Sequence, residues 1–257
     1  MRHERLGILP RRKNWQSIVD DIRLALDGDL SETAILISNT LDKVSDRYKK
    51  IFNDSGVQAA FAYLVALSTK DLPLETGLTS VEINLDKNPS IFRITADLSS
   101  WVDAHASSNE YAELACRAAA DTITKWSRQK SIQQNLFDDS SNANNVWSGI
   151  DGRGFCDIAR TFFAKFTERY IKYFIERSAS AETKSLHDRE RFENVLSEHI
   201  ESISQHAFET SKITQSFSTG WFNKTAKSHR PTNDEISGFL AVAFGKLHEE
   251  LSREGVS

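Results

Sequence analysis

The sequence predicts a mainly α-helical protein that folds as a multi-helix bundle. Only 11 Gly and 4 Pro occur among 257 residues, and strands joined by many tight turns need more of both. Apolar residues instead recur at helical spacing over long segments. With 39% hydrophobic and 26% charged residues, and with 15 Phe and 5 Trp, the composition is that of a globular protein and excludes global disorder.

The N-terminal part contains the most regular helical pattern. A first helix is expected at about residues 12–27, and a second covers residues 30–51. In the second, apolar positions alternate steps of four and three, which is typical of a helix-packing seam. The seam consists of Leu30, Ala34, Ile37, Leu41, Val44, Tyr48 and Ile51. Its partner is either another helix of the same chain, which we favour, or a second copy in a homodimer formed through the Leu30–Ile51 seam.

Later segments repeat the helical signal. Helices are expected at about residues 55–68, 109–134, 155–178, 185–213 and 233–253. The first of these is apolar nearly all round, which predicts a buried helix. The third is the most aromatic, and its apolar face is wide enough to contact more than one neighbour. The last begins with a capping box formed by Thr232 and Glu235.

The helical pattern is interrupted in two places. Residues 79–86 alternate apolar and polar side chains, which predicts a short β-hairpin or an irregular insertion near residues 79–95, with a second extended piece at Ile91–Ile94. The polar and Gly-rich residues 138–153 predict a linker. This linker separates an N-terminal helical region, 1–137, from a C-terminal helical region, 154–257, and the two can pack as one domain.

The sequence predicts a cytoplasmic protein. No apolar run approaches the roughly 18 residues that cross a bilayer, and residues 1–25 lack the plan of a signal peptide. The two cysteines, Cys116 and Cys156, lie far apart without a CxxC pair. Neither a disulfide framework nor a cysteine-built zinc site is therefore expected, and both thiols are expected to fill small apolar spaces.

No pattern identifies a catalytic, cofactor or metal site. His199 and His206 share one helix face with His187 nearby, but HExxH is absent and a metal needs a third ligand. In the alternative, these histidines are polar residues beside a helix seam. The Arg–His spacing of HEPN-type helical RNases and a GxSxG nucleophile elbow are both absent.

Two weaker patterns imitate known sites. Asp71 with the run Glu82-Ile83-Asn84 resembles the layout of a magnesium nuclease, but Asn84 stands where that layout has a Lys. The run SGIDGRGF at residues 148–155 can cradle a phosphate with free amides at a helix start, with Arg153 adding charge. The alternative, which we favour, is a flexible entry into the helix.

Positive charge is concentrated in two segments of an otherwise acidic chain, whose net charge is −4. One is residues 1–15, and the other, residues 210–233, contains no acidic residue. The second segment interleaves aromatic rings with cations, as surfaces that bind single-stranded nucleic acid do. In the alternative, its aromatics pack on the core and only its cations are solvated. The candidate contacts for nucleic acid or an acidic protein partner are Trp221, Phe222, Lys224, Lys227, Arg230, Arg11, Arg12 and Lys13.

Two stretches carry a resemblance to known proteins. GFCDIARTFFAKFTERYIKYFIERSAS from Gly154 and HAFETSKITQSFSTGWFNK from His206 resemble uncharacterised accessory proteins of bacterial anti-phage defence operons. The resemblance implies a subunit of a multiprotein anti-phage assembly whose enzyme is another chain, and it transfers no site residues.

These observations favour a non-enzymatic helical adaptor or structural subunit that binds other protein subunits and no membrane. The alternative function is a nucleic-acid-binding component that uses the basic aromatic segment 212–230.

Overall fold

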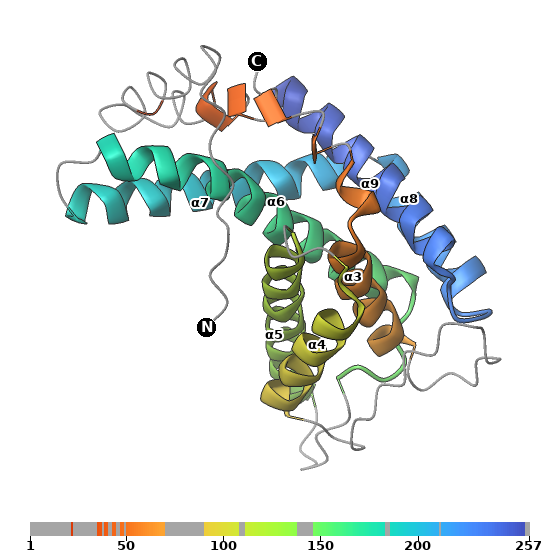
Figure 1. The fold of residues 1–257 in the computed structure, drawn as a ribbon. Helices are drawn as coiled ribbons and strands as arrows, with labels where there is room; N and C mark the ends of the chain where they lie inside the picture. Colours follow the sequence, from red (N-terminus) through yellow and green to blue (C-terminus); the bar gives the residue numbers. More distant parts are fainter. Residues whose placement is uncertain are drawn as a thin grey trace.

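The computed structural model describes residues 22, 35–37, 39–40, 43–44, 47–48, 50–69, 90–107, 111–137, 146–182, 186–210 and 212–254. Over these residues the protein is mostly helical and has no β-strand (Figure 1), so the predicted mainly α-helical bundle is confirmed. The elements are the 3₁₀ turn η1 (Ile51–Asn53), α3 (Ser55–Ser68), α4 (Ile91–His105), α5 (Ala112–Phe137), α6 (Gly152–Glu182), α7 (Leu186–Thr210), α8 (Lys212–Trp221), the π-helical turn η2 (Phe222–Ala226) and α9 (Asn233–Glu254). None of the helices described here is long and apolar enough to cross a membrane.

The long helix α6 is the element on which the others pack. It contacts α3, α5, α7 and α8, which agrees with the wide apolar face predicted from its sequence. Its buried aromatic residues are Phe155, Phe162, Phe163, Phe166, Tyr170 and Phe174. The ring of Phe61, from α3, lies 5.4 Å from that of Phe162 and 5.1 Å from that of Phe239 on α9. Three helices that are distant in sequence therefore share one aromatic core.

Helix α3 lies between α4, α5 and α9 (Figure 1), and its side chains are buried on nearly every side. The predicted buried helix at 55–68 is confirmed. The helix begins where it does because Asp54 caps it: the carboxylate accepts hydrogen bonds from the amides of Gly56 and Val57, at 2.9 and 3.1 Å.

The expectation of an extended piece at Ile91–Ile94 is wrong, because these residues form the first turn of α4. Ser90 caps the helix by accepting a hydrogen bond from the amide of Arg93 at 3.2 Å. The buried stripe of Ile94, Leu98 and Val102 has helical spacing, but four residues at the start of a helix are too few to show it. The rest of the predicted insertion, residues 79–89, lies outside the described residues.

The described members of the Leu30–Ile51 seam pack inside their own chain. These are Ile37, Val44, Tyr48 and Ile51, and all four are buried. The Tyr48 hydroxyl forms a 2.9 Å hydrogen bond with Thr167 of α6, and its ring packs edge-on against Phe244 of α9. Leu30, Ala34 and Leu41 lie outside the described residues, as does the predicted helix 12–27 except for the buried Ile22.

The C-terminal third contains one helix that sequence periodicity missed. The expected helix 185–213 corresponds to α7, and a separate helix, α8, follows it from Lys212 to Trp221. The π-helical turn η2 closes α8, with the Lys227 amide donating to the Phe222 carbonyl at 2.9 Å. The predicted capping box of α9 is confirmed, since Glu235 accepts from the Thr232 amide at 2.8 Å and donates its own amide to the Thr232 hydroxyl.

Residues 146–153, the described half of the predicted linker, are hydrogen-bonded to α5. Trp147 is buried, and its indole N–H donates to the Ser127 hydroxyl at 3.2 Å. The indole N–H of Trp126 donates to the Val146 carbonyl at 3.1 Å. Residues on both sides of this segment belong to one continuous hydrophobic core.

Two glycines of this segment, Gly152 and Gly154, allow close packing at the entry into α6. A Cβ at Gly152 would lie 2.6 Å from the Thr219 methyl carbon, and one at Gly154 would lie 3.0 Å from Trp126. Gly149 takes the left-handed conformation, with φ of 67°. The chain turns into α6 here because only glycine allows α8 and α5 to approach so closely.

A matched pair of glycine substitutions tests this packing. In Gly56→Ala the new Cβ would meet the backbone of Ala112, whose Cα is 2.6 Å away, so the free energy of unfolding should fall by about 1–3 kcal/mol. In Gly238→Ala, inside α9, the new Cβ meets nothing within 4 Å, and the free energy of unfolding should rise by about 0.5–1 kcal/mol. Urea unfolding measures both, and equal effects would contradict the packing at Gly56.

Candidate functional site

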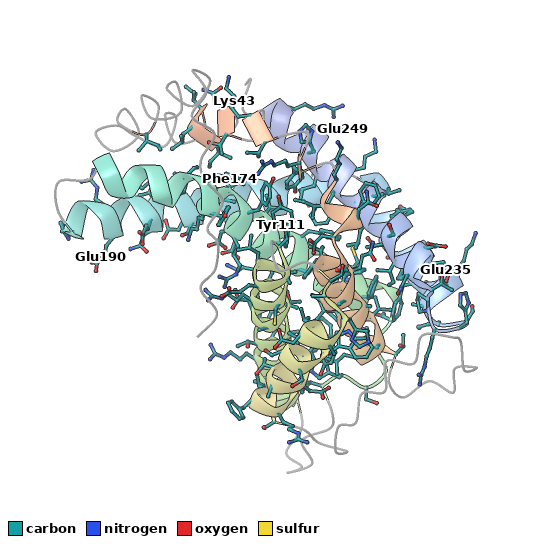
Figure 2. All side chains as sticks on the ribbon, in the orientation of Figure 1. Lys43, Tyr111, Phe174, Glu190, Glu235 and Glu249 are labelled. Carbon is teal, nitrogen blue, oxygen red and sulfur yellow. The ribbon has the colours of Figure 1, made fainter. Side chains whose placement is uncertain are left out.

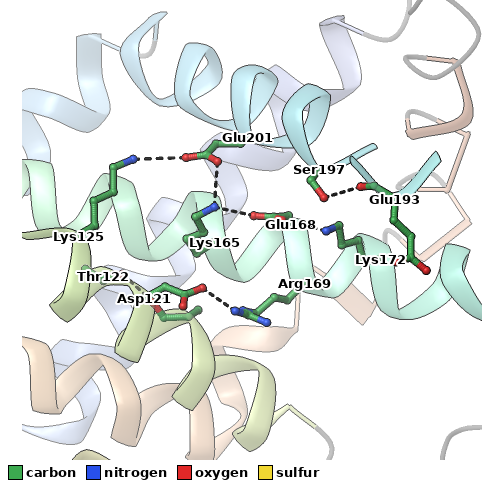
Figure 3. A network of polar contacts seen from close by, with 11 residues as sticks. Asp121, Thr122, Lys125, Lys165, Glu168, Arg169, Lys172, Glu193, Ser197 and Glu201 are labelled. Atoms are coloured by element: carbon green, nitrogen blue, oxygen red, sulfur yellow. Dashed lines mark hydrogen bonds and ion pairs between the residues drawn. The ribbon is translucent and has the colours of Figure 1, made fainter. Parts of the chain in front are cut away.

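A line of charged side chains joins α5, α6 and α7, and we call it the α6 polar network (Figure 3). Lys165 on α6 lies at its centre, with its ammonium 2.9 Å from Glu201 of α7 and 3.0 Å from Glu168 of α6. The second Glu201 oxygen lies 3.3 Å from Lys125 of α5, and the second Glu168 oxygen lies 3.1 Å from Lys172. Each carboxylate therefore accepts from two ammonium groups.

The network holds its members in their charged forms. Burial by itself lowers the pKa of Lys165, but the hydrogen bonds and charges of Glu201 and Glu168 outweigh burial and raise that pKa. Burial raises the pKa of Glu201, but the ammonium groups of Lys165 and Lys125 outweigh it and lower that pKa. Lys165 and Glu201 are therefore charged at neutral pH, and their ion pairs connect α5, α6 and α7.

A pocket of about 210 Å³ lies between α5 and α6, next to the network. Lys125 belongs to both. The pocket is lined by Thr122, Lys125, Trp126 and Gln129 of α5 and by Asp157, Ile158, Arg160 and Thr161 of α6. Its wall is mostly polar, and two of its charged members, Arg160 and Asp157, pair with each other at 3.1 Å.

The two aromatic residues predicted to contact nucleic acid pack on the core. Phe222 is fully buried and stacks on Phe155 with ring centroids 4.4 Å apart. Trp221 is partly buried, and its ring centroid lies 5.9 Å from that of Phe155 and 4.7 Å from that of Phe239. The arrangement is the one given by the core-packing alternative, because these rings, at the end of α8 and the start of η2, pack against Phe155 of α6 and Phe239 of α9.

The cations of the same segment lie at the surface. Lys224 is exposed, whereas Lys227 and Arg230 are partly exposed. The Lys227 ammonium lies 5.5 Å from the Phe222 ring centroid, which adds a cation–π contact. In the loop between η2 and α9, the His229 imidazole lies 3.0 Å from the Glu235 carboxylate. Arg11, Arg12 and Lys13 lie outside the described residues.

The structure does not support a phosphate cradle at SGIDGRGF. The carboxylate of Asp151 already accepts from the Gly154 amide at 2.7 Å, and its negative charge at the start of α6 opposes a bound anion. Gly152 is buried against Thr219, whose hydroxyl donates to the Gly152 carbonyl at 3.2 Å. The Asp151 carboxylate therefore caps the start of α6 through the Gly154 amide.

The other residues that the sequence singled out have limited descriptions. Both cysteines are free thiols, and Cys156 is buried, with burial raising its pKa to about 11. Among the described side chains no group of three His, Cys, Asp or Glu gathers where a metal ion would fit. The structure does not describe the side chains of His199 and His206. Asp71 and residues 82–84 lie entirely outside the described residues.

One aromatic side chain is prominent on the surface. Phe92, in the first turn of α4, is 82% exposed. It lies off the buried stripe of α4, whose members are Ile94, Leu98 and Val102. The sequence analysis did not single it out, because apolar periodicity over residues 91–94 was assigned to a strand.

The pocket was also missed from the sequence. Lys125 and Arg160 belong to helices whose pairing is a tertiary event, so no spacing in the chain links them. The one local signal was that polar residues interrupt the apolar faces of both helices. Comparisons with known proteins add no analogy: no protein family, no curated protein sequence and no solved structure matches this chain.

Removal of Glu201 tests the network through the pH dependence of stability. Because its pKa is lowered in the folded protein, the Glu201 carboxylate stabilises the fold above its ordinary pKa of 4.5, and this contribution is lost as the pH falls through the folded value. Glu201→Gln should lower the free energy of unfolding by about 1 kcal/mol at pH 7, and the difference from wild type should shrink below about pH 4.5.

The matched control is Glu249→Gln. Glu249 pairs with Lys246 at 2.7 Å within α9, but its side chain is 53% exposed, so its removal should have almost no effect at either pH. Denaturant unfolding at pH 7 and pH 4 measures both variants. A Glu201→Gln effect that is the same at the two pH values would contradict the assignment.

Proposed function

We propose that this chain is a non-enzymatic helical adaptor or structural subunit of a bacterial multiprotein assembly. Anti-phage defence is the setting implied by the resemblance of residues 154–180 and 206–224 to accessory proteins of defence operons. The observation that carries the proposal is Phe92, a large aromatic side chain that the fold leaves 82% exposed. Aromatic anchors of this kind supply much of the binding energy at protein interfaces.

Helix α4 presents Phe92 on a rigid support. The Tyr63 hydroxyl of α3 donates to the Ile94 carbonyl at 3.1 Å and to the Asp97 carboxylate at 2.9 Å. One turn further, the indole N–H of Trp101 donates to the Ala59 carbonyl at 3.2 Å. Because α4 is held by these bonds and by its own buried stripe, binding through Phe92 requires little ordering of the helix, which favours affinity.

The proposal predicts that Phe92 is needed for partner binding and not for folding. The chain is purified at native level from its own cells after nuclease treatment, and co-purifying proteins are identified and quantified by mass spectrometry. A stoichiometric protein partner is expected with wild type and should be lost with Phe92→Ser. The free energy of unfolding should change by no more than about 0.5 kcal/mol, because the side chain is exposed.

Ser100→Ala is the matched control, since Ser100 is exposed on the same helix and its substitution should leave the partner bound. The absence of any stoichiometric partner would refute the proposal, and a partner retained by Phe92→Ser would refute the role of Phe92.

A second function, nucleic-acid binding, is favoured by the surface cations between α8 and α9. Lys224 is exposed, and Lys227 and Arg230 are partly exposed, in a segment that contains no acidic residue. Because Phe222 is buried and Trp221 is partly buried against the core, this surface would bind mainly through phosphate contacts, so its affinity would depend strongly on salt.

Charge reversal tests this second function. The triple variant Lys224→Glu, Lys227→Glu, Arg230→Glu should bind a single-stranded oligonucleotide more weakly. The slope of log affinity against log salt should flatten by about 0.7 for each lost phosphate contact. The control triple, with Glu at Lys43, Lys50 and Arg93, changes the net charge equally at exposed positions elsewhere. Equal losses in both triples would contradict a local site, as would unchanged affinity in the first.

A further inference from the structure

We propose that the exposed face of α4 binds a second copy of this chain, with the two α4 helices packed antiparallel about a two-fold axis. The inference rests on the proposed function, in which Phe92 is an interface anchor, and it names the first partner of that anchor. Three observations carry it: the uncovered face of α4, the charges at the two ends of that face and the sizes of the residues between them.

Helix α4 is covered on one side only. It packs on α3 and α5 (Figure 1), and side chains project from it at the edge of the molecule (Figure 2). The face opposite its buried stripe holds exposed residues at helical spacing, and we call it the outer face of α4. Its residues are Phe92, Arg93, Ala96, Ser100, Asp103 and Ala104. An 82% exposed phenyl ring beside small, uncharged residues is typical of a protein interface.

The two charged residues of the outer face lie at its opposite ends. Arg93 is in the first turn of α4 and Asp103 is near its last turn, so about 15 Å separate them along the helix axis. Neither side chain forms an ion pair with another residue that the structure describes. An antiparallel second α4 places each Arg93 beside Asp103 of the other copy, whereas a parallel one places like charges together. Charge complementarity therefore selects the antiparallel pair.

The same arrangement fits the sizes of the other residues on the outer face. A two-fold axis that pairs position 93 with position 103 also pairs 92 with 104 and 96 with 100. The Phe92 ring then lies against Ala104 of the other copy, where a methyl group leaves room for it. Ala96 lies opposite Ser100, and such small side chains let two helices approach closely. One register therefore satisfies the charges, the ring and the contact at the centre.

The interface is small, so self-association should be weak. A helix of 15 residues is about 22 Å long, and one pair of such helices buries less surface than the roughly 1,200–2,000 Å² of stable interfaces. We expect a dimer that forms at micromolar concentration. Within an assembly, two joined copies would bind other subunits bivalently, which raises the overall affinity without new contacts.

Sedimentation velocity of the full chain at low salt, from about 1 to 200 µM, tests the proposal. Wild type should pass from monomer to dimer over this range. Arg93→Asp and Asp103→Arg should each weaken the dimer about tenfold or more, because either change places two like-charge pairs in the contact. The double variant Arg93→Asp, Asp103→Arg should restore the wild-type dissociation constant. The matched control is Lys224→Asp, at an exposed position in η2, which should change it less than about twofold.

A mixture of the two single variants separates pairing between copies from an effect inside one copy. Each variant alone brings like charges together, but the mixture joins a copy with two acidic groups to a copy with two basic groups. A heterodimer should therefore form at least as tightly as the wild-type dimer. Phe92→Ser should weaken the dimer about tenfold or more by removing the anchor, and circular dichroism confirms that each variant is folded.

The outcomes for this inference and for the adaptor function can be told apart. A dimer that follows the charge-swap pattern supports the inference even if no other protein co-purifies with the chain, a result that would refute the adaptor function. A chain that stays monomeric throughout the concentration range overturns the inference, while a partner protein lost with Phe92→Ser would still support the adaptor function. A dimer that is unaffected by both charge reversals and by Phe92→Ser would also overturn the inference, because the contact would then lie on another surface.

Discussion

The burial of the aromatic side chains of α6 is the constraint on which the rest of the structure depends. A single helix that carries rings on most of its circumference cannot be covered by one neighbour, so α3, α5, α7 and α8 all contact it. The rings of Phe61 from α3 and Phe239 from α9 complete this core from sites far apart in the chain. Edge-to-face and stacked ring pairs add specific geometry to the hydrophobic burial, which fixes how the helices are arranged.

The side of α6 that is not covered by aromatic packing carries its charged residues of the α6 polar network. Lys165 lies on that side and pairs with Glu201 of α7, which also pairs with Lys125 of α5, while Glu168 pairs with Lys165 and Lys172 of α6 itself. Charged groups that are half-buried require partners, and mutual pairing supplies them without any ligand. The pocket lies at the end of this stripe, where Arg160 and Lys125 approach from different helices.

Close approaches of the backbone connect the core to the surface features. Gly56 allows the start of α3 to touch Ala112 at the start of α5, and Gly152 brings α6 against Thr219 of α8. Because α3 is held in this way, α4 is held as well, through the hydroxyl of Tyr63. The exposed Phe92 consequently lies on a rigid helix. The cations Lys224, Lys227 and Arg230 lie in and after η2, which Phe222 fixes to the core.

The sequence by itself determined the helical class, most of the described helices and several of their ends, because spacing and caps are local. The buried α3, the wide face of α6 and the capping box of Thr232 and Glu235 follow from residues within a few positions of one another. The prediction of an extended piece at Ile91–Ile94 failed, because four residues are too few to separate helical from extended periodicity. The sequence pattern also did not predict α8 as a separate helix. Only the tertiary structure placed Phe222 in the core and brought Lys125 and Arg160 to one pocket. The physical reason is that helix pairing joins residues far apart in the chain, and no spacing in the sequence records which faces meet.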